Sequence, residues 1–135
     1  MENIKGFLKN DKFAEHVGIK LLEVSKGGAK AKLDINEKHL NGANIVHGGT
    51  IFILADFVFA AASNSHGTIA LAINANISYL KAVSSGTLIA EAKEVSLNPK
   101  LATYTIHVTN ECDDLIAIFQ GMVYRKKDRI DDLVR

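Results

Sequence analysis

The segment Gly49–Ala62 restricts the fold of this chain more than any other part of the sequence. Eleven of the twelve residues from Ile51 to Ala62 are apolar, and Asp56 is the exception. A helix without a polar stripe is buried on most of its sides rather than laid on a surface. We therefore expect this helix to be wrapped by a sheet, by another subunit, or by both.

The carboxyl group of Asp56 is unusual in such a helix. Asp is a poor helix-interior residue, and Asp56 lies seven residues past Gly49, too far in to cap the helix. An ionised acid in apolar surroundings needs a partner or a raised pKa. Asp56 is therefore either a buried acid held by a nearby hydroxyl or amide, or a general base or nucleophile, because perturbed acids cluster at active sites.

The triplet His47-Gly48-Gly49 stands at the start of this helix. Two glycines let a ligand approach the backbone closely. The first N–H groups of a helix lack internal partners and sit at the positive end of its dipole, which suits a carbonyl or oxyanion. The triplet alone also fits a plain tight turn, but together with Asp56 it favours a site.

The spacing of these two features limits how they can cooperate. Gly48 and Asp56 are eight residues apart, which on a straight helix is about 12 Å along the axis. One carbonyl group cannot touch both within one copy of the chain. If both act on the same carbonyl, they come from different subunits, so the spacing predicts a dimer.

Strand patterns flank the helix on both sides in the sequence. Ser25-Lys26-Gly27-Gly28 is a hairpin signal, and Tyr104, Ile106 and Val108 alternate with polar residues. Short connections make the sheet mainly antiparallel, and the sequence predicts an α+β fold with one helix against one sheet. A helical turn is expected over Asp11–His16, and the expected strands are Ile19–Val24, Ala29–Ile35, Thr68–Leu80, Gly86–Ser96, Leu101–Asn110 and Leu115–Tyr124.

Length and composition predict a single domain. The 135 residues fit one domain, 1–135, with a core over about 11–125 and a charged tail from Arg125 that is solvated or a frayed helix. A net charge of +1 argues against nucleic-acid binding by bulk charge. No apolar run reaches the roughly 20 residues of a membrane span, and the chain shows no signal peptide. One cysteine, Cys112, indicates a reducing compartment, and we expect a cytoplasmic protein.

Other chemistries lack their motifs in this sequence. The five histidines show no metal-ligand spacing, so no metal is expected; they are His16, His39, His47, His66 and His107. The chain has no Gly-x-Ser-x-Gly elbow and no Gly-x-Gly-x-x-Gly or P-loop pattern.

The residues that lead into the helix, together with Asp56, resemble a known family. The run from Leu40 to Asp56, with Asn41-Gly42, His47-Gly48-Gly49 and Asp56 at the family spacing, is similar to hotdog-fold thioesterases of the PaaI type in the 4-hydroxybenzoyl-CoA thioesterase superfamily. Asn76–Lys81 resembles the strand that follows the helix in that family, although Ala82 stands where a proline is common. The resemblance covers roughly residues 11–125.

The resemblance implies a fold and an assembly. A long central helix would be wrapped by a curved antiparallel sheet, and two protomers would pair their sheets edge to edge. Such homodimers would associate into a homotetramer, with active sites at the dimer interface. The implied reaction is hydrolysis of an acyl-CoA thioester, with an aryl-acetyl, aromatic or medium-chain acyl group and without a metal or other cofactor.

The resemblance also implies roles for individual residues. Asp56 would activate water or attack the thioester, and the Gly48 N–H would polarise its carbonyl. Asn41 would help to hold the carbonyl or water, and His47 would shape the turn. The substrate would also meet Gly49, Asn74 and Lys81; relatives can have a hydroxyl at the position of Asn74, and Lys81 would contact a CoA phosphate.

Two other functions also fit these residues. A non-catalytic acyl-CoA sensor would bind the same ligand without releasing thiol, and a hotdog dehydratase would use a histidine plus an acid. The apolar acyl slot beside the helix is expected near Phe57, Phe59 or Tyr79, each of which also fits plain core.

Overall fold

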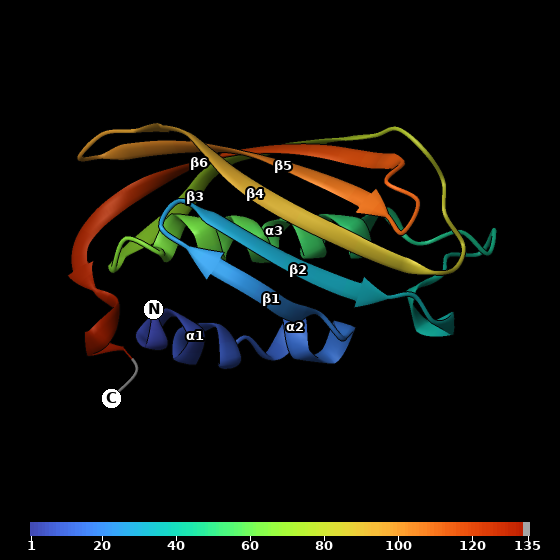
Figure 1. Ribbon diagram of the computed structural model, residues 1–135, viewed down its shortest axis with the longest axis horizontal. Coiled ribbons are helices and arrows are strands. Elements are labelled where there is room, and N and C mark those ends of the chain that lie inside the picture. The colour runs from blue at the N-terminus through green and yellow to red at the C-terminus, as the bar shows by residue number, and fades with distance from the viewer. Residues whose placement is uncertain (134–135) are drawn as a thin grey trace.

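One long helix lies inside a curved, six-stranded antiparallel sheet in the computed structural model, which describes residues 1–133 (Figure 1). The central helix is α3 (Gly48–Asn64). The strand order is β1-β2-β4-β5-β6-β3, so β1 and β3 form the two edges. The strands are β1 (Lys20–Ser25), β2 (Gly28–Asp34), β3 (Thr68–Tyr79), β4 (Thr87–Leu97), β5 (Leu101–Asn110) and β6 (Leu115–Arg129).

Two short helices contact the side of α3 that faces away from the sheet (Figure 1). They are α1 (Glu2–Lys9) and α2 (Lys12–Val17). The Asp11 side chain caps α2 by accepting a hydrogen bond from the Ala14 N–H, and Gly18 ends it in the left-handed conformation at φ 97°. Two 3₁₀ turns, η1 (Glu37–His39) and η2 (Ile130–Asp132), complete the structure.

The predicted α+β architecture is confirmed. The central helix begins at Gly48 and ends at Asn64, slightly longer at both ends than the apolar run. All six expected strands are present, and β5 has the predicted bounds. The sheet is antiparallel throughout, as the short connections predicted.

The chain ends differ from expectation. The helix α1 was not predicted, although Ile4 and Leu8, one helical turn apart, are both buried. The charged segment from Arg125 is not a frayed tail: β6 continues to Arg129 because it pairs with β3, and Ile130 beyond it is buried. The core therefore extends past residues 11–125 in both directions.

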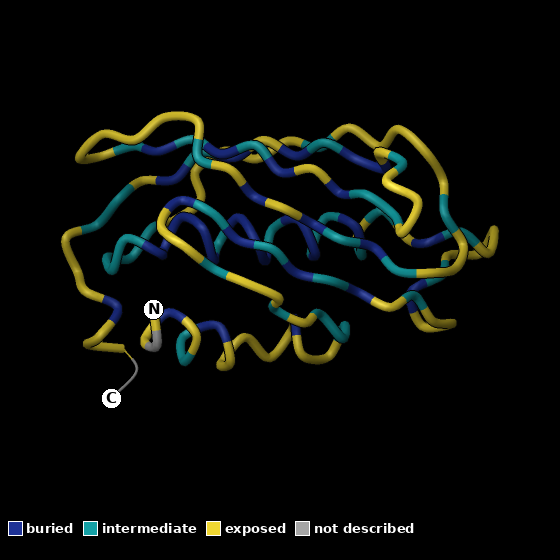
Figure 2. The backbone as a smooth tube through the Cα atoms, viewed as in Figure 1, coloured by how far each residue is buried: buried dark blue, intermediate teal, exposed yellow. Residues whose placement is uncertain are grey.

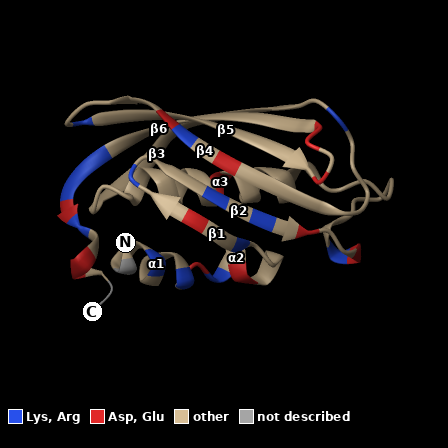
Figure 3. Ribbon diagram, in the orientation of Figure 1, with Lys and Arg blue, Asp and Glu red and all other residues tan. Residues whose placement is uncertain are grey.

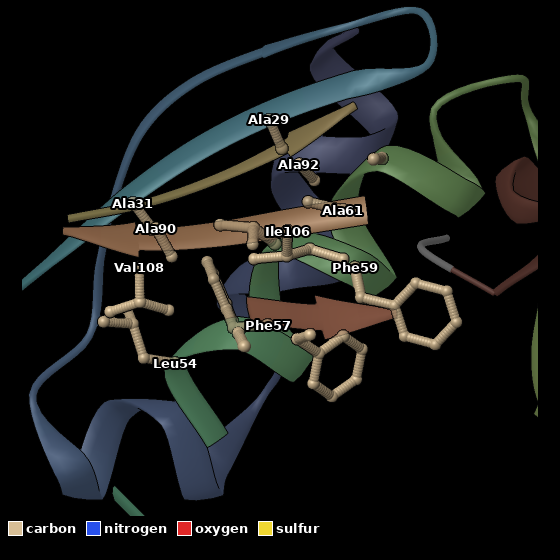
Figure 4. Close-up of a cluster of buried hydrophobic side chains, with 14 of the residues drawn as sticks. Ala29, Ala31, Leu54, Phe57, Phe59, Ala61, Ala90, Ala92, Ile106 and Val108 are labelled. Carbon is tan, nitrogen blue, oxygen red and sulfur yellow. The ribbon is translucent and has the colours of Figure 1, made fainter. Parts of the chain in front are cut away.

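Alanines on the inner face of the sheet let α3 pack close to it (Figure 4). Ala29 and Ala31 of β2 and Ala90 and Ala92 of β4 are all fully or almost fully buried against the helix. The larger α3 side chains fill the remaining space, and Phe59 packs edge-on against Tyr104 with ring centroids 5.8 Å apart. Small residues on the sheet and large ones on the helix give the interdigitated packing of a protein core.

Gly121 is the position where this packing tolerates no side chain. A Cβ built there would lie 2.5 Å from Phe59 Cζ. We expect Gly121→Ala to destabilise the protein by about 1–3 kcal/mol in urea unfolding, because a buried ring must shift. The double variant Gly121→Ala/Phe59→Leu should recover part of that loss. Gly42→Ala is the matched control, since nothing lies within 4 Å of a Cβ there; equal losses at both glycines would refute this packing argument.

A hydrogen-bonded cluster fixes the far end of α3. The His66 Nε2 atom lies 2.6 Å from Glu94 Oε2, and the Tyr104 hydroxyl donates to the same oxygen at 2.8 Å. Burial opposes ionisation of Glu94, but the bonds from His66 and Tyr104 outweigh it and hold the pKa of that carboxyl below its usual value. The loop after α3 is thereby tied to β4 and β5.

Candidate active site

One face of α3 remains partly exposed, whereas the rest of the helix is covered (Figure 2). Beyond the first turn, the half-buried residues follow helical spacing: they are Phe52, Ile53, Asp56 and Ala60. We call this line of residues the open stripe. The sheet covers the other faces, and α2 lies beside the stripe. The predicted wrapping is therefore incomplete within one copy of the chain, and the only charged residue of α3 lies in the gap.

The environment of Asp56 matches the sequence argument for a perturbed acid. Burial, and secondarily the negative charge of Asp11, raise the pKa of the Asp56 carboxyl above its ordinary value. Among residues 1–133 no hydrogen bond or ion pair reaches this carboxylate. Within residues 1–133, no hydroxyl or amide therefore satisfies Asp56 as it would a buried structural acid. A half-buried, unpaired carboxylate is suited to accept a proton.

The start of α3 presents a free N–H donor. His47 is the N-cap, and its Nδ1 accepts a hydrogen bond from the Gly49 N–H at 2.9 Å. The Gly48 N–H has no acceptor within residues 1–133. Of the two glycine amides, the one at Gly48 is thus available to a ligand, and it lies at the positive end of the helix dipole.

Close packing against Tyr79 also favours glycine at position 48. The Tyr79 hydroxyl donates to the Gly48 carbonyl at 3.0 Å, and a Cβ at Gly48 would lie 3.2 Å from the Tyr79 ring. Tyr79 is therefore part of the wall around the helix start. Sequence reasoning named it only as a possible pocket residue, and no local motif signals its bond to Gly48.

Asn41 organises the loop that leads into the helix. Its side-chain oxygen accepts hydrogen bonds from the N–H groups of Ala43 at 2.9 Å and Ile45 at 3.2 Å. Its side-chain NH₂ group makes no hydrogen bond among the described residues. Asn41 is exposed, so this NH₂ group can donate to a ligand while the oxygen maintains the loop.

An apolar groove of about 450 Å³ runs beside the helix start. Phe13 and Val17 of α2 form one side, and Phe52 and Ile53 of the open stripe form the other. Tyr79, His47, Gly49 and Thr50 complete its lining. Phe13 and Tyr79 are more than half exposed, which is costly for aromatic rings in one isolated copy.

Asn74 and Lys81 are not brought to Asp56 within one copy. Asn74 pairs with Met122 across β3 and β6, which turns its side chain to the outer face of the sheet, away from α3. The Lys81 ammonium group lies 2.6 Å from Asp114 on the surface, and this hydrogen bond and charge raise its pKa. Their substrate contacts stay predictions.

Of the aromatic residues predicted for the acyl slot, one belongs to the hydrophobic core and two line pockets. Phe59 is core, packed between Tyr104 and Phe119. Phe57 is nearly buried but lines a pocket beneath α1 and α2, and Tyr79 lines the groove. Asp11, whose charge acts on Asp56, was missed as a site residue because a helix N-cap in the sequence carries no sign of what it faces.

Neither a metal cluster nor a spanning helix is found in the described chain. Within residues 1–133, no three His, Cys, Asp or Glu side chains gather as metal ligands would. In the same range, no helix has the length and apolar character that crossing a membrane requires.

Comparison with known proteins places the chain in a family. The sequence pattern of the thioesterase superfamily matches residues 43–117, more than half of the chain. A protein named "Putative esterase" from Archaeoglobus fulgidus is 50% identical over 127 residues, covering 93% of this chain and 82% of its own length. Acyl-coenzyme A thioesterase PaaI from Escherichia coli is 32% identical over 125 residues, covering 92% of this chain and 89% of its own.

Solved structures agree with the sequence comparison. The E. coli PaaI protein from the phenylacetic acid degradation operon superposes with a TM-score of 0.91 at 30% identity, covering 95% of this chain and 94% of that one. The smu.793 protein of Streptococcus mutans bound to acetyl CoA gives a TM-score of 0.79 at 25% identity, covering 83% and 91%. The helix and sheet described above thus form a hotdog fold, and the chain belongs to the thioesterase superfamily as a member of its PaaI-like branch.

Proposed function

We propose that this protein hydrolyses an acyl-CoA thioester to a free acid and CoA. The single observation that carries the proposal is Asp56, an unpaired, half-buried carboxylate on an otherwise apolar helix of this fold. Two relatives support the substrate class: one is named as an acyl-coenzyme A thioesterase, and another has been solved with acetyl CoA bound.

The chemistry follows from the groups at hand. In the general-base route, the Asp56 carboxylate takes a proton from water while the water oxygen bonds to the thioester carbon. Charge develops on the carbonyl oxygen, where the Gly48 N–H and the Asn41 NH₂ group can stabilise it. The C–S bond then breaks, and the CoA thiolate leaves with the proton. In the nucleophile route, a carboxylate oxygen of Asp56 bonds to the carbon, and the C–S bond breaks to release the CoA thiolate and leave a mixed anhydride. Water then cleaves the anhydride, which gives the acid product and restores the Asp56 carboxylate, and the proton that the water gives up passes to the thiolate.

The site needs a second copy of the chain. Asp56 and Gly48 lie on one helix, eight residues apart, which is about 12 Å along the axis. We propose that Asp56 of one copy faces the Gly48 N–H of another, so that each carbonyl is held between two subunits. The partner helix would then cover the open stripe and the exposed apolar groove.

The strand β3 is the edge where two copies would join. It is twelve residues long and has no charged residue (Figure 3). Leu71 and Ile73 on this strand are half exposed. Long uncharged edges invite strand pairing, whereas the opposite edge, β1, is short and charged. We propose pairing of β3 with its copy in a homodimer, and assembly of two dimers into a homotetramer through exposed apolar side chains such as Val95 and Leu97.

Thiol release from a panel of acyl-CoAs tests this function. We expect steady turnover of at least one aryl-acetyl, aromatic or medium-chain substrate by the wild-type protein. We also propose that the reaction takes place in the reducing cytoplasm. Tight binding of acyl-CoA without thiol release would instead identify a sensor and refute hydrolysis.

The pH dependence of kcat/KM provides a second prediction. Because only ionised Asp56 can take a proton, activity falls as the pH drops through its pKa, and burial and Asp11 place that fall above the pH of an ordinary Asp. We expect Asp11→Asn to move the acid limb to lower pH, while Asn keeps the cap of α2. Glu15→Gln, a neighbouring carboxylate on α2, is the control. An unchanged limb in Asp11→Asn would contradict this coupling.

A further inference from the structure

A second apolar pocket lies under the N-terminal helices, separate from the groove at the helix start. It has a volume of about 620 Å³, is open to the surface, and is lined by residues of α1, α2, β1 and α3. Most of its wall is apolar and comes from Leu8, Ala14, Ile19, Leu21 and Phe57. Five charged residues also line it: Lys5, Lys9, Asp11, Glu15 and Lys20. This volume is within the roughly 300–1,000 Å³ of small-molecule sites. We call it the α1–α2 pocket.

Three observations place the α1–α2 pocket next to Asp56. Phe57, its α3 residue, follows Asp56 in the chain. Asp11 lines the pocket, and its charge acts on the Asp56 carboxyl. Ile53 and Phe57 lie one helical turn apart on the same side of α3, and they contribute to the groove and to this pocket respectively. Asp56 comes three residues after Ile53 and directly before Phe57, so it borders the stretch of helix where the two hollows approach each other.

We propose that the α1–α2 pocket binds the distal carbons of the acyl group, on the same copy of the chain that supplies Asp56. This proposal rests on the proposed thioesterase function. A thioester carbonyl beside Asp56 would send its acyl group into apolar walls, while the CoA portion stays outside. The pocket would make the enzyme prefer acyl groups of several carbons, or with an aryl ring, over acetyl.

Leu21 is the residue through which the pocket can be filled without touching the chemistry. It is half-buried on the edge strand β1 and lines the pocket. Leu22 is its matched control, because it is adjacent, 47% exposed and outside the pocket lining. Both would be changed to Trp, and both variants checked for unfolding temperature.

The measurement is kcat/KM for acetyl-, octanoyl- and phenylacetyl-CoA. We expect Leu21→Trp to lower the octanoyl and phenylacetyl values by about tenfold or more and to leave acetyl within about threefold, since a blocked apolar pocket discriminates by acyl size. Leu22→Trp should leave all three unchanged, and Leu21→Ala should shift the preference to longer chains. Equal losses for all three substrates in Leu21→Trp, or no loss, would overturn the pocket assignment.

A binding measurement separates this proposal from the proposed function. Octanoate added to wild-type protein should shift the backbone amide resonances of Leu8, Ala14 and Leu21, and Leu21→Trp, but not Leu22→Trp, should abolish the shifts. If these shifts occur and the wild type releases no thiol from any acyl-CoA, the pocket stands and the thioesterase function falls. If thiol is released but octanoate leaves these amides unmoved, the pocket assignment falls alone.

Discussion

Asp56→Asn should reduce kcat/KM for the best acyl-CoA substrate by about 10²–10⁴-fold, the usual contribution of a general base. The substitution keeps the size and a polar end, but it removes the only acidic group on α3. Thiol release at saturating and sub-saturating substrate measures both kcat and KM, and the loss should appear in kcat. Activity within a few-fold of wild type would remove Asp56 from the mechanism.

Stability provides the control for this variant. Because burial raises the pKa of Asp56, the ionised form destabilises the folded state. That penalty is present at neutral pH and disappears as the pH falls below the pKa of Asp in the unfolded chain. Asp56→Asn should therefore unfold at an equal or higher temperature than wild type at pH 7, and lose that advantage in acid. An inactive variant that is also less stable at pH 7 would point to a structural role.

Much of the fold followed from the sequence because local patterns and tertiary structure agree there. The apolar run predicted a covered helix, and the alternation of Tyr104, Ile106 and Val108 marked β5 with its inward face. The spacing between Gly48 and Asp56 needed only the helix rise, and both residues do lie on α3. These features depend on short-range periodicity, which a single sequence displays.

The sequence did not predict the features of the structure that depend on contacts between residues distant in the chain. The charged end of β6 has no strand signature of its own, and pairing with β3 extends it to Arg129. Asn74 would share the inward face of Ala72 in an unbroken strand, but the register shifts between Ala72 and Asn74 and turns Asn74 outward. The influence of Asp11 on Asp56 depends on how α2 docks against α3, which its cap does not reveal.

The shared site makes a sharp prediction about mixed oligomers. Gly48→Pro removes the N–H donor and is compatible with the local backbone, since proline is well suited to the first helical position and His47 already has the extended backbone, φ −59° and ψ 135°, that precedes proline. Gly48→Ala is the matched control: it adds the same Cβ beside Tyr79 and keeps the N–H. We expect Gly48→Pro to lose far more activity than Gly48→Ala.

Mixing Asp56→Asn with Gly48→Pro subunits tests the central claim most directly, namely that each site combines Asp56 of one copy with the helix start of another. In a mixed dimer, one site carries both substitutions and the other carries neither. Equal amounts, unfolded and refolded together, should restore about a quarter of wild-type activity, because half of the dimers are mixed and half of their sites are intact. Hetero-oligomers verified by mass that stay as inactive as their parents would contradict the shared site.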